Sequence, residues 1–215
     1  MSYTFDVYPS QVDIPTFNDV LDLSNVYLKD FLAKNGVNRF FQIDVTIKKY
    51  IRSTRMHNAM PTIKSESAKW NEAKMGEDEL DYAWFFVEGQ GGGDALFCTN
   101  EDLTVKILES MIVDDEKGGH YKRELRNCLD NGFHWCFFRY IGRPAIVNLM
   151  CGSVVAAFAK LTDGIISSGD GAWDWSLFPT KADEFIQHYF NPDCPDTEYG
   201  RWAKDCLDDM KNKFQ

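Results

Sequence analysis

The residues best suited to chemistry lie in a glycine-containing turn in the last third of the chain. Asp170 and Asp174 flank Gly171, Ala172 and Trp173. Two carboxylates beside such a turn can bind a divalent cation or act as general acid and general base. They can equally be turn residues, because an Asp carboxylate accepts hydrogen bonds from nearby backbone N–H groups. The turn role is favoured, since a calcium site needs a denser set of oxygen ligands.

The same turn carries two large aromatic side chains, Trp173 and Trp175. Tryptophans in a short loop either fill the core beneath it or form a contact surface, and Trp is enriched at protein interfaces. Filling the core is the commoner role. If the rings point outward, Asp170, Trp173, Asp174 and Trp175 form the candidate binding site.

A second pair that could be reactive is His134 with Cys136, two residues apart on a predicted strand and therefore on one face. A Cys/His nucleophile needs a partly exposed thiol. Phe133, Trp135 and Phe137 surround this pair, which favours a buried structural role. The six cysteines contain no C-x-x-C spacing and the four histidines lie on separate predicted elements, so no metal or cofactor site is predicted.

Regular hydrophobic patterns predict the elements that position these residues. Alternation predicts strands at 3–8 and 41–47, and apolar runs predict strands at 82–88, 95–98 and 133–141. The glycine-rich segment 89–93 predicts a hairpin between two of them. Residues 53–80 are polar, with room for one short helix at 67–75, and predict either a functional loop or a mobile insertion.

Helical spacing and capping residues predict the helices. A capping box at Thr16 and Asp19 begins one that ends at Asn35-Gly36, unless Ser24-Asn25 divides it. Asn100 is the predicted cap of a helix at 101–113. That helix is expected to direct Leu103, Ile107, Leu108 and Met111 inward. Further helices are predicted at 121–129, at 144–161, after a capping box at Thr180 and Asp183, and at 197–214.

Helix 144–161 is apolar almost all round, so it must be covered on most sides, and Gly152 should let another element approach closely. These elements predict an α+β fold in which a mainly antiparallel sheet of about five strands is covered by helices. A length of 215 residues favours a single domain that spans residues 1–215.

The charge of the chain restricts its partners. Lys and Arg number 23 against 33 Asp and Glu, giving a formal charge of −10. An acidic surface repels phosphate backbones and anionic membranes, so we expect neither nucleic acid nor membrane as a partner, whereas a basic protein would be attracted. The N-terminal residues lack a basic segment followed by an apolar run, and we expect a cytoplasmic protein with reduced thiols.

The opening MSYTFDVYP, the acidic α+β character and a late IISSGDGAWDW turn followed by KADEFIQHYF resemble bacterial immunity proteins that neutralise toxins of contact-dependent or type VI secretion systems. This resemblance covers about a quarter of the chain and transfers no functional residue. It implies a binding role in which an acidic protein covers a toxin, for instance a basic nuclease.

Two other classes of function remain open. One is a small hydrolase or transferase whose site would be assembled from Asp170, Asp174, Ser167, Ser168 and His188. The other is a scaffold or assembly subunit. No G-x-S-x-G, H-E-x-x-H, G-x-G-x-x-G or EF-hand pattern is present, which favours binding over catalysis.

Overall fold

The computed structural model describes residues 2–51, 56–59, 79–113, 119–140, 142–168, 178–193 and 198–214. Its strands form one sheet in the order β3-β2-β4-β5-β6-β1-β7, and every paired neighbour is antiparallel. The strands are β1 (Ser2–Tyr8), β2 (Ile43–Ile51), β3 (Met56–Ala59), β4 (Glu79–Val87), β5 (Gly91–Thr99), β6 (Phe133–Tyr140) and β7 (Ile165–Ser167). The predicted α+β fold is therefore confirmed, with seven strands.

Both strands that the sequence did not indicate lie at the edges of this sheet. β3 falls within the segment predicted as a loop, and β7 within the segment between two predicted helices. Each has at most four residues, too few to show a clear alternation. Short edge strands are also a common way in which proteins limit unwanted pairing.

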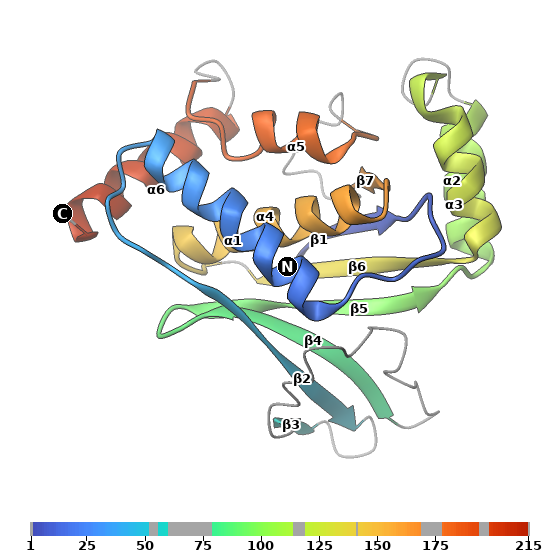
Figure 1. Ribbon diagram of the computed structural model, residues 1–215, viewed down its shortest axis with the longest axis horizontal. Helices are drawn as coiled ribbons and strands as arrows, with labels where there is room; N and C mark the ends of the chain where they lie inside the picture. The colour runs from blue at the N-terminus through green and yellow to red at the C-terminus, as the bar shows by residue number, and fades with distance from the viewer. Residues whose placement is uncertain are drawn as a thin grey trace.

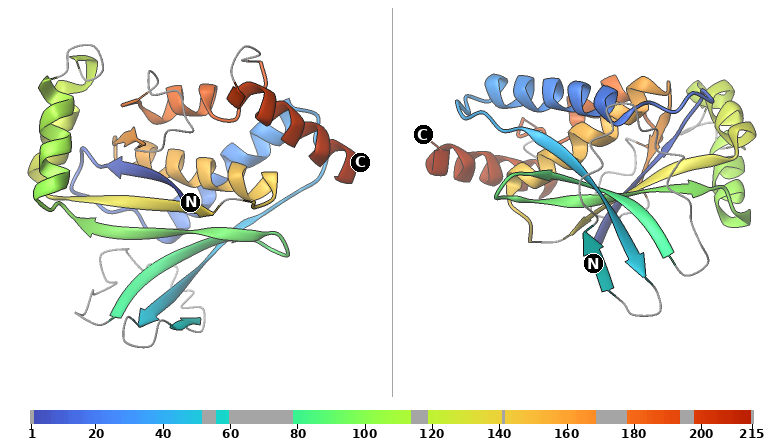
Figure 2. Two further views of the ribbon diagram at one scale, coloured as in Figure 1. Left: turned by 180° about the vertical axis from the view of Figure 1, so that it is seen from behind. Right: turned by 60° about the horizontal axis from the view of Figure 1, so that its bottom comes forward.

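Helices cover one face of the sheet (Figure 1). They are α1 (Phe17–Lys34), α4 (Ala145–Leu161), α5 (Ala182–His188) and α6 (Glu198–Phe214), and α4 contacts the other three as well as the sheet. A separate pair, α2 (Asp102–Val113) and α3 (Lys122–Asn131), stands at one end of the sheet, apart from that layer (Figures 1 and 2). No helix in the described parts of the chain is long and apolar enough to span a membrane.

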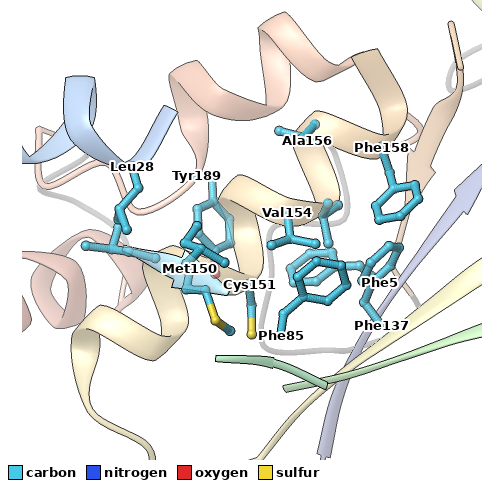
Figure 3. Close-up of a cluster of buried hydrophobic side chains, with 14 of the residues drawn as sticks. Phe5, Leu28, Phe85, Phe137, Met150, Cys151, Val154, Ala156, Phe158 and Tyr189 are labelled. Atoms are coloured by element: carbon cyan, nitrogen blue, oxygen red, sulfur yellow. The ribbon is translucent and has the colours of Figure 1, made fainter. Parts of the chain in front are cut away.

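Helix α4 lies at the centre of the core, as its apolar sequence predicts. Residues 146–159 are all buried. In Figure 3 its Val154 and Phe158 lie beside aromatic side chains of the sheet, and Phe158 contacts Trp135 and Phe137 at ring-centroid distances of 5.1 and 5.3 Å. The close approach predicted at Gly152 is also present, because a Cβ there would lie 2.1 Å from a ring carbon of Tyr189.

The observed capping residues confirm one of the predicted helix starts and correct two others. Thr16 and Asp19 form the capping box of α1, which continues through Ser24 and Asn25 without a break. The predicted caps at Asn100 and Thr180 are wrong. The side chain of Asn100 is instead hydrogen-bonded to His134, with 2.8 Å between Asn100 Oδ1 and His134 Nδ1. The Thr180 hydroxyl donates to Glu184, while Lys181 occupies the N-cap of α5.

Candidate functional site

The turn predicted as a binding site lies outside the described residues, so Asp170, Trp173, Asp174 and Trp175 stay a prediction. The described residues on either side of it are close together. Ile166 and Thr180 exchange two backbone hydrogen bonds, of 2.8 and 3.0 Å. Phe178, the first described residue after the turn, is buried against Phe5.

The other members of the predicted hydrolytic site have different environments. Ser167, the last residue of β7, and Ser168 directly after it are buried, whereas His188 is exposed in the last turn of α5. A nucleophile and its general base must meet on one surface that the substrate can reach. The described residues therefore give this enzyme hypothesis no support.

His134 and Cys136 share one face of β6, as expected, together with Asp6 of the neighbouring β1. Burial lowers the pKa of His134 to about 4, so the ring is neutral near pH 7, and its Nδ1–H donates to Asn100. Burial also raises the pKa of the Asp6 carboxyl. The pKa of Cys136 is raised by burial first and then by the nearby Asp6.

Thiols with raised pKa values are poor nucleophiles, because the reactive species is the thiolate. Cys98, on the adjacent β5, also has its pKa raised by burial, to about 11. This polar cluster on the sheet is consequently structural in character. Among the described residues, no group of three or more His, Cys, Asp or Glu side chains is arranged to hold a metal ion.

Helix α2 leaves large apolar side chains exposed. The sequence predicted that Leu103, Ile107, Leu108 and Met111 face inward, and for two of them this is wrong. Leu103 is 70% exposed and Ile107 is 39% exposed, while Leu108 is fully buried. Val113, at the end of the helix, is 79% exposed. Most residues of α2 are apolar, yet Leu108 is its one buried side chain.

The geometry of α2 explains why these side chains are left out of the core. Leu108 packs with Leu125 of α3 and with Tyr8 and Ile165 of the sheet, and Met111 and Ile112 lie partly buried beside it. Successive residues of an α-helix are rotated by about 100°, so Leu103 and Ile107 lie on the side away from Leu108. We call the exposed side chains Leu103, Ile107 and Val113 the outer face of α2.

Helix α2 and the residue before it also expose charged side chains. Glu101, Asp102 and Glu109 are exposed, and Lys106 is the one basic residue among them. Segment 101–113 therefore carries three acidic groups against one basic group.

A second surface feature is an open groove of about 230 Å³ at the end of α1. Lys29 and Arg39 line it, and Phe40 beside them is 71% exposed. The Arg39 guanidinium lies 4.6 Å from the ring centre of Phe214 and 5.3 Å from that of Phe41. Because its charged side chains are basic, this groove would repel a basic partner.

Comparison with known proteins identifies no relative of this chain. No family model matches the chain, and no curated protein or solved structure is significantly similar to it.

Proposed function

We propose that this chain is a non-catalytic binding protein that neutralises a cognate bacterial toxin by covering the toxin's active site. The observation that carries the proposal is the outer face of α2, where Leu103 and Val113 are 70% and 79% exposed. Single exposed apolar residues are common on protein surfaces, but adjacent ones support a contact surface, and Leu103 and Ile107 are neighbours four residues apart on α2. In this proposal the protein acts in the cytoplasm.

Two further observations support binding rather than catalysis. The formal charge of −10 would attract a basic toxin and accelerate the encounter between the two proteins. In addition, the described thiols of Cys98 and Cys136 have raised pKa values, which makes them unreactive near neutral pH. The predicted turn at Trp173 and Trp175 stays a second candidate contact.

The test uses the product of the reading frame next to the gene for this chain. That product is expressed alone and together with the chain, and both growth and complex formation are measured. We expect the product alone to stop growth, co-expression to restore growth, and the two proteins to co-purify as a stable complex. The proposal is wrong if the product is toxic and the chain neither binds it nor restores growth.

A further inference from the structure

The groove at the end of α1 is formed by the way in which the chain leaves that helix. Gly36 has a left-handed conformation with φ of 71°, and its N–H donates to the Ala33 carbonyl at 3.1 Å. The Val37 N–H donates to the Leu32 carbonyl at 2.9 Å. These two bonds are those of a Schellman motif, which turns the chain sharply at the helix end. Segment 37–41 and the last turns of α1 therefore enclose the groove between them.

The inner surface of this groove is apolar. Its lining includes the buried side chains of Leu32, Val37 and Phe41, together with Ala33 and Phe40. Phe40 is 71% exposed, so its ring is available to contact an occupant. The volume of about 230 Å³ is below the range of about 300–1,000 Å³ that is usual for sites of drug-sized ligands. The groove therefore suits a small molecule with an apolar body.

Two cationic side chains, Lys29 and Arg39, lie at the same surface and are exposed. Among the described residues, neither of them forms an ion pair with a carboxylate. Asn38 also lines the groove, and its side-chain amide can donate hydrogen bonds. Asp30, which follows Lys29 on α1, is exposed but does not line the groove. The described lining thus offers donors and positive charge to an anion.

The Arg39 guanidinium is held in place by two aromatic rings. The segment after α1 passes the C-terminal end of α6 on its way to β2 (Figure 1), which brings Arg39 over the ring of Phe214 as well as that of Phe41. These two rings lie 5.1 Å apart and nearly perpendicular, at 74°. A guanidinium that contacts rings through its face keeps the N–H donors at its edge for a carboxylate. Its fixed position lowers the entropy cost of binding.

The charge of the whole chain favours a small occupant over a large acidic one. An acidic protein, including a second copy of this chain, would oppose its charge to the formal charge of −10 across a wide interface. A small carboxylate interacts mainly with charges within the Debye length, which is about 8 Å at physiological ionic strength. In the groove these nearby charges are the two cations of its lining.

From these observations we propose that the groove at the end of α1 binds a small carboxylic acid with an aromatic body. The carboxylate pairs with Lys29 and Arg39, while the ring lies on the apolar lining beside Phe40. This site is separate from the outer face of α2, and the inference goes beyond the proposed function and does not depend on it.

The first experiment titrates the full chain with three probes and follows the backbone amides by NMR. Phenylacetate carries both the charge and the ring, phenylacetamide carries the ring without the charge, and acetate carries the charge without the ring. We expect phenylacetate to bind at least about tenfold more tightly than either of the others, because each of them lacks one of the two attractions. Its shifts should centre on residues 29–41, and its affinity should fall as the salt concentration is raised.

The second experiment removes the cations one at a time. Lys29→Gln keeps a good helix-forming residue on α1 and should lower the affinity for phenylacetate about threefold. Lys34→Gln is the matched control, since Lys34 is an exposed lysine of the same helix that does not line the groove. Its affinity should stay within about 1.5-fold of the parent chain, because the solvent screens the more distant charge.

Arg39→Gln should also weaken binding of phenylacetate. Because Arg39 contacts Phe214, this variant is compared only after circular dichroism and urea unfolding show that it is folded. If it does not fold, Lys29→Gln still tests the role of the cations, since Lys29 is exposed on the surface of α1.

Several outcomes would overturn the inference. They are the absence of saturable phenylacetate binding, equal affinities for phenylacetate and phenylacetamide, shifts centred outside residues 29–41, and equal losses in Lys29→Gln and Lys34→Gln. Tighter binding of the peptide N-acetyl-Glu-Phe-amide than of phenylacetate would show that the groove serves a protein segment instead. A dimer of the free chain that Lys29→Gln dissociates would show that a second copy occupies it. Neutralisation of a toxin is measured separately, so failure here leaves the proposed function standing.

Discussion

Gly152 shows how a single residue sets the spacing between two elements of the core. The Tyr189 ring occupies the space that a side chain at this position would need, and its hydroxyl donates to the Asn148 carbonyl at 2.6 Å. The ring also stacks on Phe185 with 4.8 Å between centroids. Tyr189 is therefore fixed on both sides and cannot easily move away.

Gly152→Ala should consequently destabilise the protein. Overpacking costs about 1–3 kcal/mol, and a better helix propensity offsets up to about 1 kcal/mol of this. Because a Cβ would lie 2.1 Å from a ring carbon, we expect a net loss of about 2 kcal/mol in the free energy of unfolding, measured with urea. Gly119→Ala is the control, since no heavy atom lies within 4 Å of a Cβ there. Equal stabilities of the two variants would contradict the prediction.

His134 should make stability depend on pH. Burial lowers the pKa of its folded form to about 4, whereas an unfolded histidine titrates near 6.5. Between these two values the unfolded chain binds a proton that the folded protein excludes, so the free energy of unfolding falls as the pH is lowered from 6.5 to 4. The full effect is about 3 kcal/mol at pH 4, and it is absent above pH 6.5.

The difference between the parent chain and His134→Gln isolates this effect. Asp6 works in the opposite direction, because its raised pKa lets the folded protein bind a proton before the unfolded chain does. Gln can still donate a hydrogen bond to Asn100 but does not titrate. We expect the stability of the parent chain to fall relative to the variant between pH 6.5 and 4 in urea unfolding. Parallel pH profiles would show that His134 is not the source.

At the level of elements, Asn25 joins α1 to the outer edge of β2. Its side chain accepts from the Ile43 N–H at 2.7 Å and donates to the Ile43 carbonyl at 3.1 Å. The edge strand β3 pairs with β2 only from Lys48 to Ile51. The side chain thus replaces a neighbouring strand at Ile43 and explains why a polar residue sits where the sequence suggested a break in the helix.

Asn25→Ala should leave the Ile43 backbone groups without these bonds and lower the free energy of unfolding by about 1–3 kcal/mol. Asn18→Ala is the matched control, because Asn18 is exposed on the same helix. Its effect should stay within about 0.5 kcal/mol. The free energies of unfolding of both variants are measured by thermal and urea unfolding. If Asn18→Ala lowers this free energy as much as Asn25→Ala does, a specific link between α1 and β2 through Asn25 is refuted.

For the molecule as a whole, burial predicts where the structure is most resistant to opening. Residues 146–159 of α4 are enclosed by the sheet and the other helices, whereas α2 contributes only Leu108 as a fully buried side chain. Opening α4 requires the loss of most of the core, but α2 can open locally.

Hydrogen exchange of the free protein should therefore be slowest at the amides of α4 and approach the rate set by global unfolding. The amides of α2 should exchange much faster in the absence of a partner. Mass spectrometry of peptides from the two helices compares them directly. Similar rates would mean that α2 unfolds together with the core.

Local patterns in the sequence determined most of the elements and the central position of α4. The alternation at 41–47, the capping box at Thr16 and Asp19, and the apolar run at 144–161 each depend on neighbours along the chain, and all three appear in the structure. The short edge strands β3 and β7 could not be found in this way, because their pairing depends on residues far away in the chain.

The candidate surface was decided by tertiary structure alone. The sequence pattern of an amphipathic helix does not show which of its apolar side chains a neighbouring element will cover. Leu103 and Leu108 were therefore both predicted to be buried. The position of α2 at one end of the sheet buries Leu108 and leaves Leu103 70% exposed. Likewise Asn100 has the chemistry of a helix cap, but the fold brings His134 to its side chain instead. The sequence determines which side chains can be buried and which can form hydrogen bonds. Only the packing of elements that are distant in the chain decides which of these contacts form.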